Sequence, residues 1–111
     1  MKIIFAGTPE ITIETLKSIH ESNHEIALIL TNEDKPSGRG KKLTKPPVKI
    51  FAEVNNIEFK QPAMLKDKFL IDFLKTKEAD LFVVFAYGHL IPEEILKIFK
   101  KGALNIHTSL L

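Results

Sequence analysis

The sequence lacks several residue types and patterns that define whole classes of protein. Its 111 residues include no cysteine and no tryptophan, so disulfides, thiolate nucleophiles and cysteine-ligated metal centres are excluded. No apolar run approaches the ~18 residues of a membrane-spanning helix, and the apolar run at the N-terminus is too short for a signal peptide. With 44% hydrophobic and 27% charged residues, the composition is that of an ordinary globular chain. We therefore expect one compact, cytoplasmic domain over residues 1–111.

Positive charge is concentrated in one segment of a chain whose net charge is only +2. Residues 31–49 contain six basic residues against two acidic ones, and they contain no aromatic residue. Glycine and proline interrupt this segment without helical or strand periodicity, which predicts a long loop without regular structure. Loops of this length are usually functional. Cations without aromatics favour contacts with phosphates along a nucleic-acid backbone over the reading of bases.

Short apolar runs alternate with stretches of helical periodicity along the rest of the chain. Thr8 is expected to cap the first helix, with Pro9 at its first position. The predicted strands are residues 2–6, 25–31, 57–59, 80–86 and 103–107. Four helices are predicted: one that begins at Pro9, two that span residues 48–52 and 69–74, and one that follows Pro92. The last two predicted helices each have an apolar face. In the first of them it consists of Phe69, Leu70, Phe73 and Leu74, and in the second of Ile95, Leu96 and Phe99. Continuous apolar strands that alternate with helices predict an α/β fold: a doubly wound, Rossmann-like parallel sheet of about five strands, with helices on both faces and strand order 3-2-1-4-5.

The predicted topology also indicates a site. Ligands bind such sheets outside the carboxyl ends of the strands, where the strand order reverses, which here is between the first and fourth strands. Asn105 and His107 come at the end of the neighbouring fifth strand, and the alternation of strand side chains places both on one face. An amide that donates to a developing oxyanion, beside an imidazole that moves a proton, is a minimal acyl-transfer pair. A polar strand end with a solvated histidine is the alternative.

The attacking group of such a reaction would come from the substrate, because the sequence offers neither a cysteine nor a serine in a nucleophile motif; an amine acceptor fits best. Residues 87–92 follow the fourth predicted strand and could hold a flat heterocycle through backbone groups, with Leu90, Ile91 and Ile95 covering its faces. An ordinary strand-to-helix turn is the alternative. Residues 7–10 lack the glycine pattern of dinucleotide sites. His20 and His24 straddle a helix end, which argues against a metal site.

Four segments together resemble the N-terminal part of the methionyl-tRNA formyltransferase family. They are KIIFAGTPE at the start, DKPSGRGKKLTKPPVK in the basic loop, VVFAYGHLIP after the fourth strand, and GALNIHTSLL at the end. The resemblance implies formyl transfer from 10-formyltetrahydrofolate to the amino group of initiator methionyl-tRNA, in translation initiation and without a metal. The last motif is shared with glycinamide ribonucleotide formyltransferase, whereas the basic loop is specific to the tRNA enzyme.

The resemblance also implies roles for individual residues. Asn105 would donate to the formyl oxygen, and His107 would stabilise the oxyanion or manage its proton. The folate would contact Tyr87, Gly88, His89, Leu90, Ile91, Ser109, Leu110 and Leu111. The tRNA phosphates would contact Arg39, Lys41 and Lys42.

One departure from the family concerns the end of the sequence. The family's third catalytic residue, an aspartate, follows the S-L-L element, and a C-terminal tRNA-binding domain follows later; neither lies within residues 1–111. We therefore expect a fragment of a longer enzyme that binds folate weakly and transfers formyl groups slowly or not at all. Two alternatives stay open: a formyltransferase of the glycinamide ribonucleotide type, and a non-catalytic α/β binding module.

Overall fold

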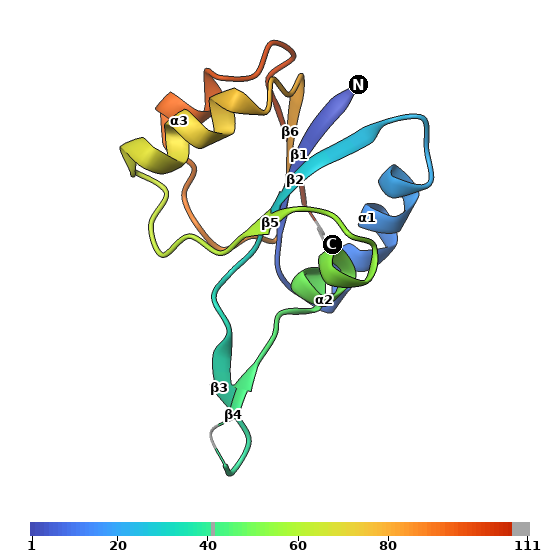
Figure 1. Cartoon of the computed structure of the whole chain (residues 1–111), viewed down its shortest axis with the longest axis vertical. Coiled ribbons are helices and arrows are strands. Elements are labelled where there is room, and N and C mark those ends of the chain that lie inside the picture. Colours follow the sequence, from blue (N-terminus) through green and yellow to red (C-terminus); the bar gives the residue numbers. More distant parts are fainter. Residues whose placement is uncertain (41, 108–111) are drawn as a thin grey trace.

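The computed structural model describes residues 1–40 and 42–107, which form a parallel sheet between two layers of helices (Figure 1). The strands of this sheet are β1 (Lys2–Gly7), β2 (Glu25–Leu30), β5 (Phe59–Lys60), β6 (Leu81–Phe85) and β7 (Ala103–Ile106). The helices are a 3₁₀ helix, η1 (Glu10–Thr12), and α1 (Ile13–His20), α2 (Pro47–Val54), α3 (Lys68–Thr76) and α4 (Glu93–Leu96). The five strands are in the order β5-β2-β1-β6-β7, which confirms the predicted doubly wound order.

The core consists of two layers because successive side chains of each strand point to opposite faces. The α1/α2 layer contains Ile3, Phe5, Leu16, Ile29, Val48, Ala52, Val83 and Phe85. The α3/α4 layer contains Ile4, Ala6, Leu28, Leu30, Leu70, Leu74, Phe82, Val84, Tyr87 and Ile95. Each fully buried aliphatic or aromatic side chain stabilises the fold by about 1.5–3 kcal/mol. The central strands are therefore apolar on both faces, as the uninterrupted apolar runs predicted.

The end of β1 permits no side chain. A Cβ atom added to Gly7 would lie 2.8 Å from the backbone oxygen of Phe85 and 2.8 Å from the Phe5 ring. Glycine at this position therefore lets β1 and β6 stay paired up to their carboxyl ends, where Gly7 lies opposite Phe85.

The first helix begins later than predicted. Pro9 is extended, with ψ 171°, and is followed by η1 before α1 starts at Ile13. The Pro9 carbonyl accepts hydrogen bonds from the backbone N–H (3.1 Å) and the hydroxyl (2.8 Å) of Thr12, which tightens the chain into a 3₁₀ turn. Thr8 is not the helix cap; its hydroxyl accepts a hydrogen bond from the backbone N–H of Asn32 at 3.4 Å.

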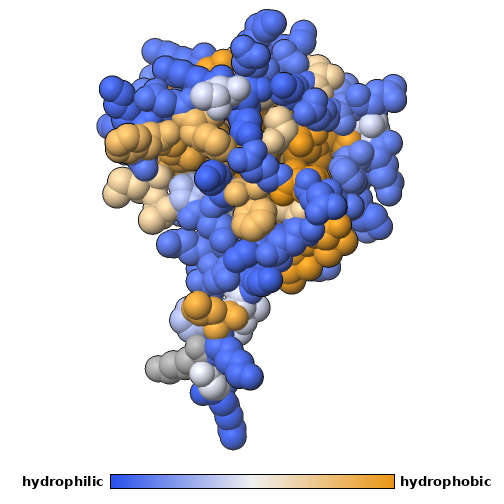
Figure 2. Space-filling view, in the orientation of Figure 1, coloured by the Kyte–Doolittle hydropathy of each residue, from blue (hydrophilic) through white to orange (hydrophobic). Residues whose placement is uncertain are grey.

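The basic segment contains regular structure, so the prediction of a loop without regular structure is wrong. The strands β3 (Lys35–Ser37) and β4 (Lys42–Thr44) pair antiparallel and project away from the sheet as a hairpin (Figure 1). Gly38 has φ +75° in the turn between them, a conformation that glycine adopts without strain. Figure 2 shows the hairpin as a mostly hydrophilic projection. The hairpin is formed by backbone pairing, so the sequence shows no alternation of hydrophobic residues from which its strands could be predicted.

Three smaller predictions about apolar residues also need correction. The third strand is Phe59–Lys60 rather than 57–59, because the backbone N–H of Ile57 instead bonds the Ala52 carbonyl and closes the end of α2. Phe69 is 86% exposed, since α3 buries Leu70 and Leu74 against the sheet. Leu96 is 37% exposed, because the single turn of α4 buries only Ile95. In the described part of the chain, no helix has the length and apolar character needed to cross a membrane.

Candidate functional site

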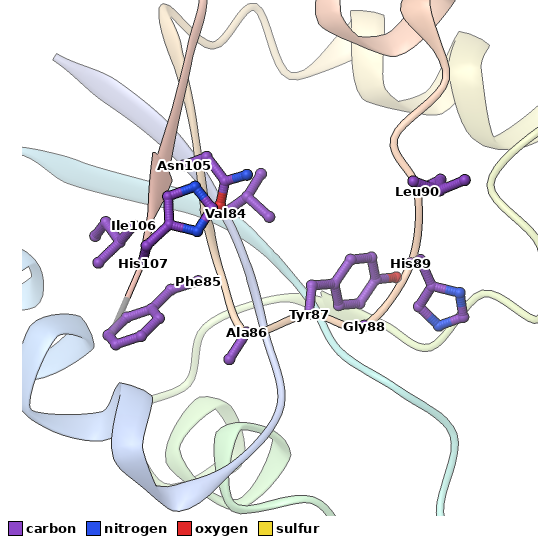
Figure 3. Close-up of a pocket in the computed structure, with 10 residues that line it drawn as sticks. All are labelled: Val84, Phe85, Ala86, Tyr87, Gly88, His89, Leu90, Asn105, Ile106 and His107. Atoms are coloured by element: carbon purple, nitrogen blue, oxygen red, sulfur yellow. The ribbon is translucent and has the colours of Figure 1, made fainter. Parts of the chain in front are cut away.

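A cavity of about 720 Å³ lies at the carboxyl ends of β6 and β7 (Figure 3). Its lining comes from residues 84–90 and 105–107, two stretches that leave adjacent parallel strands. The pairing of Val84 with Asn105 and of Phe85 with Ile106 brings these strand ends together. The cavity therefore lies beside the reversal of strand order between β1 and β6, where the topology indicated a site.

Asn105 and His107 both line this cavity. Ile106, between them, packs against the α1/α2 layer, so the pleat directs its two neighbours to the opposite side of the sheet. Figure 3 shows both side chains coming from the same strand end. Both residues are exposed, which leaves the amide and the imidazole accessible to a ligand in the cavity.

The turn after β6 (residues 86–89, the β6 turn) has an unusual backbone. Ala86 has φ +52° and Gly88 has φ +87°. A left-handed conformation costs a non-glycine residue about 1–2 kcal/mol, whereas glycine adopts it freely. The strain at Ala86 can persist only where the surroundings hold it. The β6 turn is thus a constrained rather than a relaxed connection.

Asn32 contributes to the site, and the sequence reasoning missed it. Its side-chain amide donates a hydrogen bond to the Tyr87 carbonyl at 3.1 Å, and its side-chain oxygen bonds the His89 ring nitrogen Nε2. Asn32 comes two residues after the end of β2, which neighbours β1 in the sheet. A polar residue at the end of a central parallel strand was the signal that could have identified it.

Tyr87 points into the core. Its side chain is 1% exposed and belongs to the α3/α4 layer, and its ring centroid lies 4.8 Å from that of His89. Within the described residues its hydroxyl has no hydrogen-bond partner. Burial raises the pKa of Tyr87 to about 12. This hydroxyl therefore stays protonated to a higher pH than that of an exposed tyrosine.

We expect the substitution Tyr87→Phe to raise the free energy of unfolding by about 1 kcal/mol, because it removes a buried polar group that lacks a partner. Since the folded-state pKa lies above that of the unfolded chain, the wild type should also lose stability as pH rises from about 10 to 12. The variant should lack this loss. Urea unfolding at pH 7 and above pH 10 measures both effects, and a less stable variant at pH 7 would contradict the assignment.

The other residues that were expected to contact the folate differ in whether they line the cavity. Leu90 lines the cavity and is 95% exposed. Ile91 packs against the α3/α4 layer and is not part of the cavity lining. Ile95 is fully buried in the core, so the expectation that it covers a ligand is wrong. Ser109, Leu110 and Leu111 lie outside the described residues.

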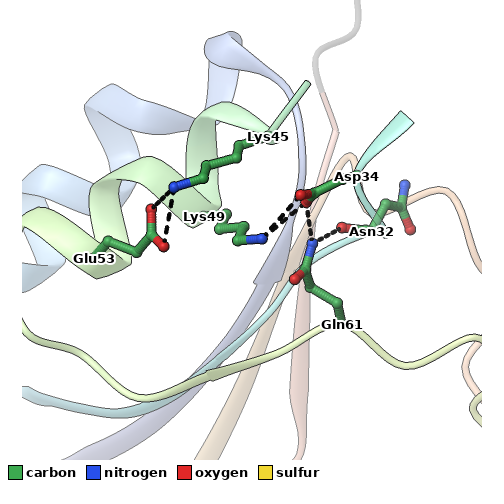
Figure 4. Close-up of polar contacts among 6 residues, drawn as sticks. All are labelled: Asn32, Asp34, Lys45, Lys49, Glu53 and Gln61. Atoms are coloured by element: carbon green, nitrogen blue, oxygen red, sulfur yellow. Dashed lines mark hydrogen bonds and ion pairs between the residues drawn. The ribbon is translucent and has the colours of Figure 1, made fainter. Parts of the chain in front are cut away.

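A set of polar residues anchors both ends of the hairpin (Figure 4). Lys49 of α2 bonds both carboxylate oxygens of Asp34 at 3.0 Å, and Gln61 donates to Asp34 at 2.7 Å and to the Asn32 carbonyl at 2.9 Å. The Gln61 amide, and after it Lys49, lower the pKa of the Asp34 carboxyl below its usual value. We call these four residues, Asn32, Asp34, Lys49 and Gln61, the hairpin base.

The ion pairs of this region reduce the number of cations that a nucleic acid could contact. Lys49 is paired with Asp34, and Lys45 lies 3.0 Å from Glu53. Arg39 and Lys42 are exposed and form no ion pair with any residue that the structure describes. Lys41 lies outside the described residues. The cations available for the predicted phosphate contacts are thus those of the hairpin itself, and not those of the hairpin base.

The described residues contain no group of three or more histidines and carboxylates that could hold a metal ion. His20 packs its ring edge-on against Phe51, with 5.7 Å between the centroids. His24 bonds the N-terminal amine through Nδ1 at 2.8 Å. The two histidines four residues apart therefore have separate structural contacts.

Comparison with known proteins identifies relatives along the whole chain. The sequence model of the family described as "Formyl transferase" matches residues 1–111. The methionyl-tRNA formyltransferase of Clostridioides difficile (strain 630) is 49% identical over 111 residues, which are 100% of this chain and 36% of that protein. The methionyl-tRNA formyltransferase of Fusobacterium nucleatum subsp. nucleatum is 46% identical, with the same shares covered. The chain therefore spans 36% of the length of each of these relatives.

Solved structures with a similar fold include the crystal structure of glycinamide ribonucleotide transformylase 1 from Symbiobacterium toebii. It matches with a TM-score of 0.67 at 20% identity, over 100% of this chain and 53% of that chain. Phosphoribosylglycinamide formyltransferase from Bacillus halodurans matches with a TM-score of 0.64 at 24% identity, over 99% of this chain and 57% of that chain. At these identities the likeness shows a shared α/β fold.

Proposed function

The chain belongs to the formyl transferase family, and on this basis we propose that it is the N-terminal catalytic part of an enzyme that transfers a formyl group from 10-formyltetrahydrofolate to the amino group of initiator methionyl-tRNA. The observation that carries the proposal is the cavity at the ends of β6 and β7, where Asn105 and His107 meet the β6 turn. Relatives named for this activity match the chain over all of its 111 residues.

The cavity fits a folate in size and in lining. Its volume of about 720 Å³ falls within the ~300–1,000 Å³ of small-molecule sites. The β6 turn supplies backbone donors and acceptors for the edge of a flat heterocycle, and Val84 and Leu90 supply apolar cover. We assign the folate to Tyr87, Gly88, His89 and Leu90, with Ile91 supporting the turn from the core. Ser109, Leu110 and Leu111 belong to the same proposal on sequence alone.

Asn105 of β7 and His107, which directly follows β7, have complementary roles in this proposal. The bound folate would supply the formyl group, and the methionyl amine would accept it. The Asn105 amide donates a hydrogen bond to the oxygen that gains negative charge, a contribution of about 10²–10³ in rate in comparable sites. The methionyl nitrogen would form its bond to the formyl carbon as the bond from that carbon to the folate nitrogen breaks. A ring nitrogen of His107 would take the proton that the amine loses and return a proton to the departing folate nitrogen. Because the resemblance assigns a further catalytic aspartate to a position beyond Leu111, residues 1–111 alone should transfer slowly or not at all.

The acceptor tRNA is assigned to the hairpin. Arg39 and Lys42 are exposed on a projection that stands clear of the sheet (Figure 1), and Lys41 joins them on sequence grounds. A guanidinium and two ammonium groups in one short segment suit the phosphates of a nucleic-acid backbone. A glycinamide ribonucleotide acceptor would give this charged hairpin no evident use.

Nuclear magnetic resonance on the ¹⁵N-labelled chain tests the proposal. Titration with 5-formyltetrahydrofolate, a stable relative of the donor, should shift the amide signals of residues 84–90 and 105–107. Initiator methionyl-tRNA should instead perturb residues 35–40 and 42–44, and glycinamide ribonucleotide should leave them unchanged. Folate shifts that map elsewhere would overturn the site, and hairpin signals that respond to glycinamide ribonucleotide but not to tRNA would overturn the acceptor.

A further inference from the structure

The side chain of Asn32 bonds the strained β6 turn at two points. Asn32 donates a hydrogen bond to the Tyr87 carbonyl at 3.1 Å and bonds the His89 ring. Its amide nitrogen also lies 3.7 Å from the position that a Cβ on Gly88 would occupy. Asn32 therefore bonds the two residues that flank Gly88, in a turn in which Ala86 and Gly88 have positive φ. Backbone strain of this kind persists only where neighbouring interactions maintain it.

The same residue belongs to the hairpin base. Gln61 donates a hydrogen bond to the Asn32 carbonyl at 2.9 Å and another to Asp34 at 2.7 Å (Figure 4). Asp34 immediately precedes β3, and its partner Lys49 lies in α2, which follows β4. The side chain of Lys49 is only 13% exposed, so this ion pair is less screened by solvent than the surface pairs elsewhere on the chain. The backbone of Asn32 is thus bonded by the same Gln61 side chain that bonds Asp34 at the start of the hairpin.

We propose that Asn32 is a positioning residue that couples the basic hairpin to the β6 turn, so that a nucleic acid on the hairpin and a folate in the cavity strengthen each other's binding. The inference rests on the proposed function. A nucleic acid bound to the hairpin would stabilise the hairpin base, and with it the bonds from Asn32 to Tyr87 and His89. The β6 turn is then already in the conformation that the folate binds. By linkage, the folate strengthens tRNA binding by the same factor.

A purely structural role for Asn32 makes a different prediction. Loss of its hydrogen bonds would then lower the stability of the fold and leave the two binding events independent. The ratio of folate affinities with and without tRNA separates the two roles, because a general loss of stability does not change this ratio.

The test measures the affinity of the whole chain for 5-formyltetrahydrofolate by titration calorimetry, without tRNA and with saturating initiator methionyl-tRNA. For the wild type we expect affinity that is about fivefold higher with tRNA, the lower end of measured couplings. Asn32→Leu should bring this ratio close to one. Asn55→Leu is the matched control: it removes an amide-to-carbonyl bond of 2.9 Å to Phe51, outside the hairpin base, and should keep the wild-type ratio.

If Asn32→Leu does not fold, a second variant tests the same coupling. His89→Ala removes an exposed ring that Asn32 bonds, and should lower the ratio at least in part. A wild-type ratio of one, or a ratio that survives both Asn32→Leu and His89→Ala, would overturn the coupling while leaving the proposed function intact. A wild-type chain that binds neither ligand would overturn the proposed function and, with it, the coupling.

Discussion

Replacing His107 by alanine is expected to lower kcat for formyl transfer about 10²–10⁴-fold, the usual contribution of a positioned acid–base group. His107 lines the cavity beside Asn105 and is exposed at the end of β7. Without its imidazole, the attacking amine loses the proton acceptor that the proposal assigns to it. Folate affinity should change little, because the binding contacts are assigned to the β6 turn. The effect should therefore appear in kcat and not in the dissociation constant for 5-formyltetrahydrofolate.

The assay needs a chain that carries the further catalytic aspartate. A suitable one is a chimera in which residues 1–111 replace the matching 36% of the Clostridioides difficile relative. Its formylation of initiator methionyl-tRNA is followed with 10-formyltetrahydrofolate as donor. His20→Ala is the matched control, since His20 packs against Phe51 on the α1/α2 side and its removal should leave kcat unchanged. Full turnover by the His107 variant would argue against catalysis at this cavity.

Replacing both Arg39 and Lys42 by alanine is expected to weaken tRNA binding and to flatten its dependence on salt. Each phosphate contact contributes about 0.9 to the slope of log K against log salt on a double helix. The loss of two contacts should therefore make the slope less negative by about 1.8. Binding of fluorescent initiator tRNA, measured over a series of salt concentrations, gives this slope directly.

The control for this experiment removes the same charge from paired lysines. Lys45→Ala combined with Lys97→Ala deletes two cations that lie 3.0 Å from Glu53 and 3.7 Å from Glu93. If specific phosphate contacts determine the slope, this control should leave it nearly unchanged. Equal flattening by both double variants would show that the net charge, and not the hairpin, attracts the tRNA.

The strand order and the position of the candidate cavity could be predicted because both depend on local patterns and a general topological rule. Uninterrupted apolar runs such as residues 80–86 indicate strands covered on both faces. Right-handed crossovers then leave few arrangements of five such strands. Asn105 and the β6 turn meet in the structure because the carboxyl ends of neighbouring parallel strands share one edge of the sheet.

The hairpin and the start of the first helix were predicted wrongly for opposite reasons. Pairing of Lys35–Ser37 with Lys42–Thr44 is a backbone interaction, so charged and polar side chains give no periodic signal of it. At Thr8 the local signal was strong, since threonine before proline is a good helix start. The tertiary structure overrides it, because the Thr8 hydroxyl accepts a hydrogen bond from Asn32.

The sequence by itself determined the parallel α/β sheet with helices on both faces, the polar residues at its strand ends, and the concentration of cations in residues 31–49. These features follow from side-chain polarity read along the chain, which is a local property. Only the tertiary structure decided that Lys45 and Lys49 are neutralised by carboxylates, that the Tyr87 hydroxyl is buried, and that Asn32 holds His89 across the site. Such contacts join residues far apart in sequence, and their energies depend on distances and burial that exist only once the chain has folded.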